Sequence, residues 1–226
     1  MDGTYNTADS TALMNDSLRV LIADDHPIVR RGLREILATE PQVTDVVEAA
    51  HPQQVLDLAQ TSGCDVVVLD LGLPGRGGLE VLKQLRRDHP KLPVLILSMQ
   101  PEEHYAVRAL RAGAAGYLTK DAAPAKLVEA IHKVTTGGHY ISPAVAEQLA
   151  VSLASDETKP PQELLSDREY EVLRFISSGK TVGDIAAELS LSVKTISSYR
   201  ARILEKMGMS NNAELMHYAI KNKLVD

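Results

Sequence analysis

The sequence has one cysteine, no tryptophan and no long hydrophobic run. A single thiol, Cys64, cannot close an internal disulfide, which fits a reducing compartment, and we expect it to be a small buried side chain beside a strand. No stretch approaches the roughly 20 apolar residues that cross a bilayer, and the N-terminus lacks the basic region and apolar core of a secretory signal. We therefore expect a cytoplasmic globular protein that makes no membrane contact.

An excess of basic residues is also absent. The net charge is −6, which argues against nucleic-acid binding by the chain as a whole. Residues 163–226 are neutral, with nine basic and nine acidic residues, so the whole deficit lies in residues 1–162. Within 194–206, four basic residues stand against the single acid Glu205. A basic stripe on a neutral C-terminal part can still attract phosphates.

The first two thirds of the chain repeat one pattern, in which a short apolar run precedes a segment with helical spacing. The five predicted strands, at 18–23, 43–47, 66–69, 93–97 and 116–118, are followed by predicted helices at 27–37, 52–60, 77–87, 101–111 and 124–135. Units of this length predict an α/β domain with a doubly wound, five-stranded parallel sheet.

The rest of the chain has no strand pattern. A helix near 143–154 precedes a polar, two-proline linker at 155–162. Beyond it, Ser166, Thr181 and Ser192 begin three predicted helices, which suggests an all-α helix-turn-helix module. We therefore divide the chain into a disordered extension at 1–16, an α/β domain at 17–137, a linker with a helix at 138–162, and a helical domain at 163–226. Met14 is an alternative translation start.

The stretch VVVLDLGLPGRGG, residues 66–78, delivers one carboxylate into a loop. Val66, Val67 and Val68 have no polar alternation, which indicates a strand buried on both faces. Asp70 ends this strand, and the Pro and Gly residues after it cannot continue it. Ligands of open α/β sheets bind at this carboxyl edge.

The same edge collects polar residues from the other strands. They are Asp24, Asp25, Asp70, Ser98 and Lys120. Close carboxylates repel unless a cation neutralises them, and hard oxygen ligands favour Mg²⁺. Such a site can neutralise an incoming phosphoryl group, for which Asp70 is the candidate nucleophile. Any single acid could equally be a solvated loop residue, and the pattern does not divide metal binding between Asp24 and Asp25. We interpret His26 and His104 as surface histidines.

Residues 17–137 resemble the receiver domain of two-component response regulators, a flavodoxin-like fold. The matching segments are LIADDHPIVRRGL (21–33), VVVLDLGLPGRGGLE (66–80), VLILSMQ (94–100) and AAGYLTKDA (114–122). The resemblance implies phosphorylation of Asp70 by a sensor histidine kinase, and a Mg²⁺ site formed by Asp24, Asp25, Asp70 and the Gly72 carbonyl. It also implies that Ser98, Tyr117 and Lys120 respond to the phosphoryl group. Met99 replaces a more usual small residue.

Residues 163–226 resemble the LuxR-type helix-turn-helix output domain of the NarL/FixJ subfamily, above all in KTISSYRARILEKM. The resemblance places Ser197, Ser198 and Ala201 at base-reading positions. It makes Lys194, Thr195, Arg200 and Arg202 candidates for phosphate contacts, although Arg200 also falls near the buried face. In this subfamily the receiver of the unphosphorylated form is expected to cover the recognition helix. The last helix, about 211–221, either pairs such modules on DNA or belongs to the domain core.

These features predict a transcription regulator that is switched by phosphorylation, and not an enzyme. The only chemistry expected of this regulator is the gain and loss of a phosphoryl group at Asp70. Its expected partners are the kinase, promoter DNA and a second copy of the chain when phosphorylated. The resemblance to the family implies the first and fifth receiver helices as the dimer surface, and RNA polymerase is a further candidate partner. One alternative is a phosphotransfer relay whose helical domain contacts only proteins. Another is a DNA binder independent of phosphorylation, against which the complete set of five polar residues argues.

Overall fold

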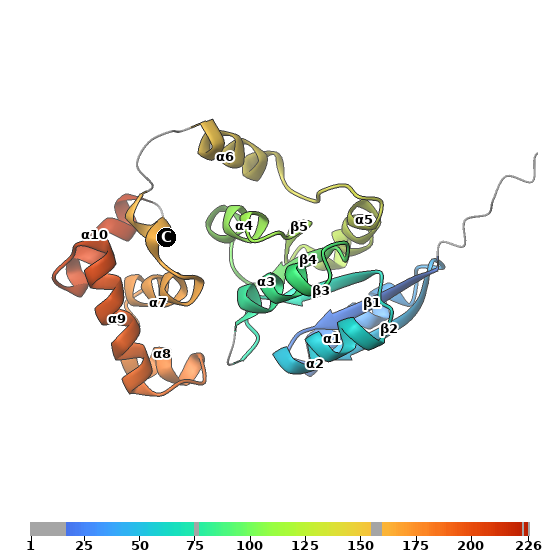
Figure 1. Cartoon of the computed structure of the whole chain (residues 1–226), viewed down its shortest axis with the longest axis horizontal. Helices are drawn as coiled ribbons and strands as arrows, with labels where there is room; N and C mark the ends of the chain where they lie inside the picture. The colour runs from blue at the N-terminus through green and yellow to red at the C-terminus, as the bar shows by residue number, and fades with distance from the viewer. Residues whose placement is uncertain (1–16, 75–76, 155–159, 223, 226) are drawn as a thin grey trace, which may run out of the picture.

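The N-terminal domain is built on a five-stranded parallel sheet (Figure 1). The computed structural model describes residues 17–74, 77–154, 160–222 and 224–225, so the predicted extension at 1–16 and Met14 lie outside the described residues. The strands are β1 (Leu18–Ala23), β2 (Val43–Ala49), β3 (Val66–Asp70), β4 (Val94–Ser98) and β5 (Gly116–Thr119), in the spatial order β2-β1-β3-β4-β5. The predicted strands and the doubly wound α/β topology are confirmed.

Five helices connect and flank these strands. They are α1 (Pro27–Leu37), α2 (Pro52–Thr61), α3 (Gly78–Asp88), α4 (Glu102–Arg111) and α5 (Ala123–Thr135). One hydrophobic cluster joins α1 and α5 to Val20 and Ile22 of β1, and another joins α2, α3 and α4 to Leu21 and Ala23. Successive residues of β1 therefore face opposite helix layers, and β3 is buried along its whole length, because both faces of a parallel sheet are covered by helices.

The segment after α5 begins as part of the first domain rather than as a free linker. Tyr140 donates its backbone N–H to the Ala115 carbonyl, and its own carbonyl accepts from the N–H of Tyr117, both at 3.0 Å. The helix α6 (Pro143–Ala154) packs against α4, with Val145 buried. A short 3₁₀ helix, η1 (Pro161–Leu164), which the sequence did not predict, then leads into the helical domain.

The helical domain consists of α7 (Asp167–Ser177), α8 (Val182–Glu188), α9 (Val193–Met207) and α10 (Asn212–Lys221). The three predicted N-caps are confirmed, since Ser166 and Thr181 form complete capping boxes and the Ser192 hydroxyl accepts from the N–H of Thr195. Leu215 and Ala219 of α10 are buried, which confirms the core interpretation for its inner face, whereas Ile220 is 60% exposed.

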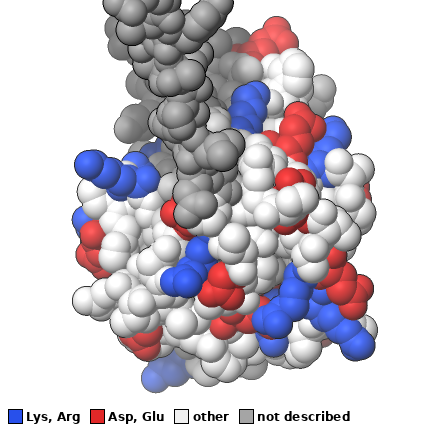
Figure 2. All heavy atoms as spheres, turned by 90° about the vertical axis from the view of Figure 1, so that its right-hand side faces the viewer, with Lys and Arg blue, Asp and Glu red and all other residues white. Residues whose placement is uncertain are grey.

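The helical domain lies beside α3 and α4 (Figure 1). The opposite end of the molecule, turned away from this domain, carries both acidic and basic side chains (Figure 2). Among the described residues, no helix is both long and apolar enough to cross a membrane.

Candidate functional site

The carboxyl edge of the sheet brings the predicted polar residues together. Asp24 follows β1, and Asp70 and Ser98 are the last residues of β3 and β4. All three are buried, with 3% or less of each residue exposed. Parallel register places these strand ends side by side, because Ala23 pairs with Leu69 and Asp70 pairs with Leu97. The expected acid cluster is therefore present.

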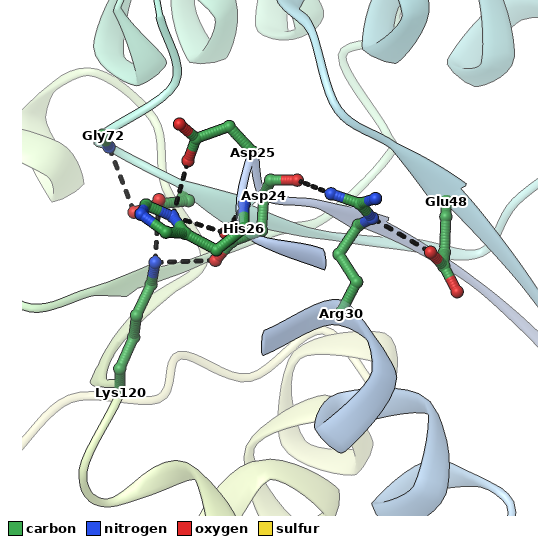
Figure 3. Close-up of polar contacts among 8 residues, drawn as sticks. Asp24, Asp25, His26, Arg30, Glu48, Gly72 and Lys120 are labelled. Carbon is green, nitrogen blue, oxygen red and sulfur yellow. Dashed lines mark hydrogen bonds and ion pairs between the residues drawn. The ribbon is translucent and has the colours of Figure 1, made fainter. Parts of the chain in front are cut away.

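Lys120 joins the two buried carboxylates (Figure 3). Its Nζ lies 2.6 Å from Asp24 Oδ2 and 2.8 Å from Asp70 Oδ2, and only 9% of its side chain is exposed. The backbone fixes this position, since the Lys120 N–H donates to the Ser98 carbonyl at 2.8 Å. A buried ammonium between two carboxylates balances part of their charge.

Burial and pairing shift the proton affinities of this pair. Burial raises the pKa of Asp70, and it outweighs the Lys120 ammonium, which acts in the opposite direction. Burial alone lowers the pKa of Lys120, but the nearby Asp70 and Asp24 carboxylates outweigh it and raise the pKa. The cluster thus keeps its ammonium while holding Asp70 in an unfavourable environment for its own charge.

The donor set fits a divalent cation. Ligand atoms of Asp24, Asp25, His26 and Asp70 all lie within 4.8 Å of one another. Buried oxygens of Asp24 (Oδ2) and Asp25 (Oδ1) meet ion-pair partners but lack a partner in hydrogen-bond geometry. Oxygens with unused acceptor capacity in an acidic pocket are what a hard cation such as Mg²⁺ requires.

His26 contacts this cluster, although the sequence predicted only a surface histidine. Its side chain is 65% exposed, as expected for a surface histidine, but its Nδ1 lies 2.7 Å from Asp25 Oδ1 and 3.2 Å from Asp24 Oδ1. The ring turns back because the His26 N–H also donates to Asp24 Oδ1, at 2.8 Å. The sequence feature that could have indicated this contact is the position of His26 directly after the two aspartates. The side chain of His104 lies outside the described residues.

Two glycines shape the loop beside Asp70. The Gly72 N–H donates to Asp70 Oδ1 at 3.0 Å, which orients the carboxylate. At Gly78, a Cβ atom would lie 2.4 Å from the Asp70 carbonyl oxygen, so α3 can begin this close to β3 only without a side chain.

Gln100 connects the predicted switch residues Ser98 and Tyr117. Its backbone N–H donates to Ser98 Oγ at 3.1 Å, and its carbonyl accepts from the Tyr117 hydroxyl at 2.9 Å. Tyr117 is buried, and burial raises the pKa of its hydroxyl above the usual tyrosine value. Met99, between Ser98 and Gln100, is 74% exposed at the edge of the pocket.

The second predicted site, on α9, presents a polar surface. Ile196, Ile203 and Met207 are buried, which confirms the inner face of the helix. Of the predicted DNA-contact residues, Lys194, Ser197, Ser198, Ala201 and Arg202 are exposed. Thr195 and Arg200 are only half-buried, and Arg200 Nε donates to Asn212 Oδ1 of α10 at 2.6 Å. The α9 surface is therefore open, and Arg200 leans toward α10.

The expectation that the receiver covers the recognition helix is wrong for this structure. The receiver instead contacts η1 and α7: Asp167 Oδ2 lies 2.5 Å from Lys83 Nζ of α3, and its Oδ1 accepts from Arg108 Nε of α4 at 2.5 Å. Arg111 Nη1 lies 2.9 Å from Glu163 Oε2. The sequence showed Asp167 only as an acid in the first turn of a helix, and nothing in it indicated the two cations.

Comparisons with known proteins support both assignments. Residues 20–132 match the model for the response regulator receiver domain, and residues 163–219 match bacterial regulatory proteins of the luxR family. Similar curated proteins include the response regulator GacA of Pseudomonas viridiflava, 40% identical over 92% of this chain and 98% of its own. Another is the response regulator UvrY of Escherichia coli strain K12, 36% identical over 92% and 95%.

A solved structure of similar architecture is the complex of the two-component response regulator RcsB with DNA. It is 29% identical, covers 93% of this chain and 100% of its own, and superposes with a TM-score of 0.55. Both domains, in the same order, recur in each of these proteins over nearly the whole chain. The chain therefore belongs to the NarL/FixJ (LuxR-type) two-component response regulators, which act as DNA-binding regulators of transcription.

Proposed function

We propose that Asp70 is the phosphoryl acceptor and that its modification controls dimerisation and sequence-specific DNA binding through α9. The single observation that carries this assignment is the Lys120 ammonium between the carboxylates of Asp70 and Asp24, beside oxygens with unused acceptor capacity. Such an arrangement suits the binding of a phosphoryl group better than a merely structural role, because a structural ion pair needs no second and third acid.

In the transfer step, a carboxylate oxygen of Asp70 attacks phosphorus, a P–O bond forms, and the P–N bond of a kinase phosphohistidine breaks. The Gly72 N–H holds one Asp70 oxygen, which leaves the carboxylate oriented for in-line attack. Lys120 Nζ already contacts the other oxygen and would stay beside the new phosphoryl group as a point charge.

Asp24, Asp25, Asp70 and the Gly72 carbonyl would hold a Mg²⁺ ion. When bound, this ion supplies positive charge that neutralises the phosphoryl oxygens. His26, which contacts both acids, would have to share or release Asp25 when the cation binds.

The signal would leave the pocket through Ser98. If the Ser98 hydroxyl turns to the phosphoryl group, it releases the Gln100 N–H. The change then reaches buried Tyr117, because the Tyr117 hydroxyl donates to the carbonyl of the same Gln100. Because the α9 surface is exposed in this structure, we propose that phosphorylation acts by pairing two chains on DNA rather than by uncovering the helix. A regulator of this kind works in the cytoplasm, where its DNA and its kinase domain are.

The test is phosphorylation of the full chain by [³²P]acetyl phosphate with Mg²⁺, comparing wild type with Asp70→Asn. Label is expected on the wild type only, together with a tighter complex with promoter fragments selected from random DNA. A labelled Asp70→Asn chain would overturn the acceptor assignment, and equal DNA affinity with and without the donor would overturn the switch.

A further inference from the structure

The cavity in front of Asp70 is walled by both domains. It has a volume of about 350 Å³, and its receiver wall includes Asp25, Asp70, Ser98 and Lys120. The opposite wall comes from the helical domain. Its residues there are Asp167, Arg168, Glu171 and Phe175 of α7, with Glu188 and Leu189 at the end of α8. The predicted phosphoryl acceptor therefore faces the DNA-binding domain.

An ionic contact holds the two walls together at one side of the cavity. Asp167 is almost fully buried and takes both Lys83 of α3 and Arg108 of α4 as partners. Arg108 also donates to the Leu165 carbonyl, so it forms two hydrogen bonds at the start of α7, one to Asp167 and one to Leu165. Removing the two cations would leave a buried carboxylate without charge compensation, which disfavours the closed contact.

Aromatic packing extends the contact beyond the ions. The rings of Tyr105 of α4 and Tyr170 of α7 meet edge to face, with centroids 5.6 Å apart. Arg108 lies over the Tyr170 ring and Arg174 over the Tyr105 ring, at 4.7 and 5.0 Å from the centroids. Each domain thus gives one tyrosine and one arginine, an arrangement that stacks cations on aromatic faces.

The DNA-reading surface takes no part in this contact. The base-reading candidates Ser197, Ser198 and Ala201 are exposed, while η1, α7 and the end of α8 meet the receiver. What the domain contact restricts is therefore the phosphorylation pocket.

We propose that the DNA-binding domain is a gate over the phosphoacceptor pocket, which admits small phosphoryl donors but excludes a kinase's phosphohistidine domain until the contact between α3–α4 and η1–α7 opens. This inference rests on the proposed function of Asp70. A cavity of about 350 Å³ is the size of a small-ligand pocket, at the lower end of the usual range of about 300–1,000 Å³. A protein donor must instead bring a folded surface against the same edge of the sheet, where α7 and α8 now lie.

Such a gate would make the phosphorylation rate depend on domain opening for a protein donor but not for a small donor. If only the open form accepts a protein donor, its apparent rate scales with the fraction of open molecules. A small donor that reaches Asp70 in both forms does not depend on that fraction. A variant that weakens the contact should therefore accelerate one reaction and not the other.

The experiment uses the full chain with substitutions on the receiver side, Lys83→Ala with Arg108→Ala, neither of which lines the acidic cluster. The protein donor is the autophosphorylated cytoplasmic part of a sensor histidine kinase, chosen as the one that transfers fastest to the wild-type chain, and the small donor is acetyl phosphate. We expect the transfer rate from the kinase to rise roughly tenfold, as it must when the open fraction grows by that factor, and the acetyl phosphate rate to stay unchanged.

Two controls make the comparison specific. Arg87→Ala with Lys91→Ala removes the same charge from exposed positions near the end of α3 and should leave both rates as in the wild type. Asp167→Asn, on the other side of the contact, should reproduce the acceleration. Equal kinase rates in all four proteins, or equal acceleration with both donors, would overturn the gate while leaving Asp70 as the acceptor. Absence of phosphorylation at Asp70 with either donor would overturn the proposed function itself.

Discussion

Arg174 Nη1 of α7 donates a hydrogen bond to the side-chain oxygen of Gln100 at 2.7 Å. Gln100 is the residue whose backbone contacts both Ser98 and Tyr117. One side chain of the DNA-binding domain is therefore two hydrogen bonds away from the hydroxyl that is expected to sense the phosphoryl group. Arg174 also donates to the Leu224 carbonyl, so the same guanidinium ties the end of the chain to this point.

Replacing Gln100 with alanine should loosen the domain contact while keeping the backbone hydrogen bonds that this residue makes in the receiver. The backbone bonds to Ser98 and Tyr117 remain, and only the acceptor for Arg174 is lost, at a cost of about 1–3 kcal/mol to the closed form. We expect faster hydrogen exchange in α7 and a larger radius of gyration by small-angle scattering. Gln53→Ala, on the exposed surface of α2, is the matched control. Unchanged exchange in α7 would show that the bond contributes nothing to closure.

Replacing Asp70 with asparagine should stabilise the receiver. The raised pKa of Asp70 means that its folded pKa lies above its unfolded value, so the charged carboxylate destabilises the fold at neutral pH and this penalty is relieved as pH falls through the folded pKa. The variant should gain about 1 kcal/mol of unfolding free energy at pH 7, measured by urea denaturation. A loss of stability would mean that Lys120 compensates the charge fully.

Removing Lys120 should have the opposite effect. Lys120→Met leaves Asp24 and Asp70 buried without their ammonium, which we expect to cost about 3–5 kcal/mol at pH 7. The raised pKa of Lys120 means that its contribution is fully present below its ordinary pKa and is lost as pH rises through the higher folded value. Added Mg²⁺ should restore part of the melting temperature. Lys126→Met, a matched change at an exposed position of α5, should leave the unfolding free energy unchanged.

The contact of Asp167 should depend on pH in the acidic range. Burial raises the pKa of Asp167, but hydrogen bonds from Lys83 and Arg108 outweigh it and hold the pKa below its usual value. Asp167 therefore favours the closed form above its ordinary pKa of about 3.9, and this contribution is lost as pH falls through the lower folded value. Energy transfer between dyes on the two domains should report the opening, and Asp167→Asn should remove that acid-induced step. Circular dichroism separates opening from unfolding.

Arg202 should contact DNA phosphates rather than bases. It is exposed on α9, with its guanidinium over the Tyr199 ring at 5.9 Å. Arg202→Ala should weaken binding to all sequences alike and reduce the slope of log K against log salt by about 1. The same substitution at Lys91, in the receiver, should leave the slope unchanged. A loss confined to one base position would assign Arg202 to base reading instead.

Local patterns in the sequence determined the elements and most of the acidic site. Asp24, Asp70, Ser98 and Lys120 could be predicted together because the ends of parallel strands meet at one edge, whatever the details of packing. The caps at Ser166, Thr181 and Ser192 were equally predictable, since a capping box depends only on residues three positions apart. The buried face of α9 follows from its helical period in the same way.

Contacts between distant elements were decided only by the tertiary structure. The sequence shows Asp167, Lys83 and Arg108 as ordinary surface charges, and their meeting depends on how the two domains pack against each other, which no local pattern specifies. The turn of His26 toward Asp25 and the link from Gln100 to Arg174 are side-chain geometries that no spacing rule specifies. By itself the sequence therefore determined that Asp70 ends a buried strand in an acidic pocket. The tertiary structure decided that this pocket faces the DNA-binding domain, because that placement arises from long-range packing and charge pairing rather than from local periodicity.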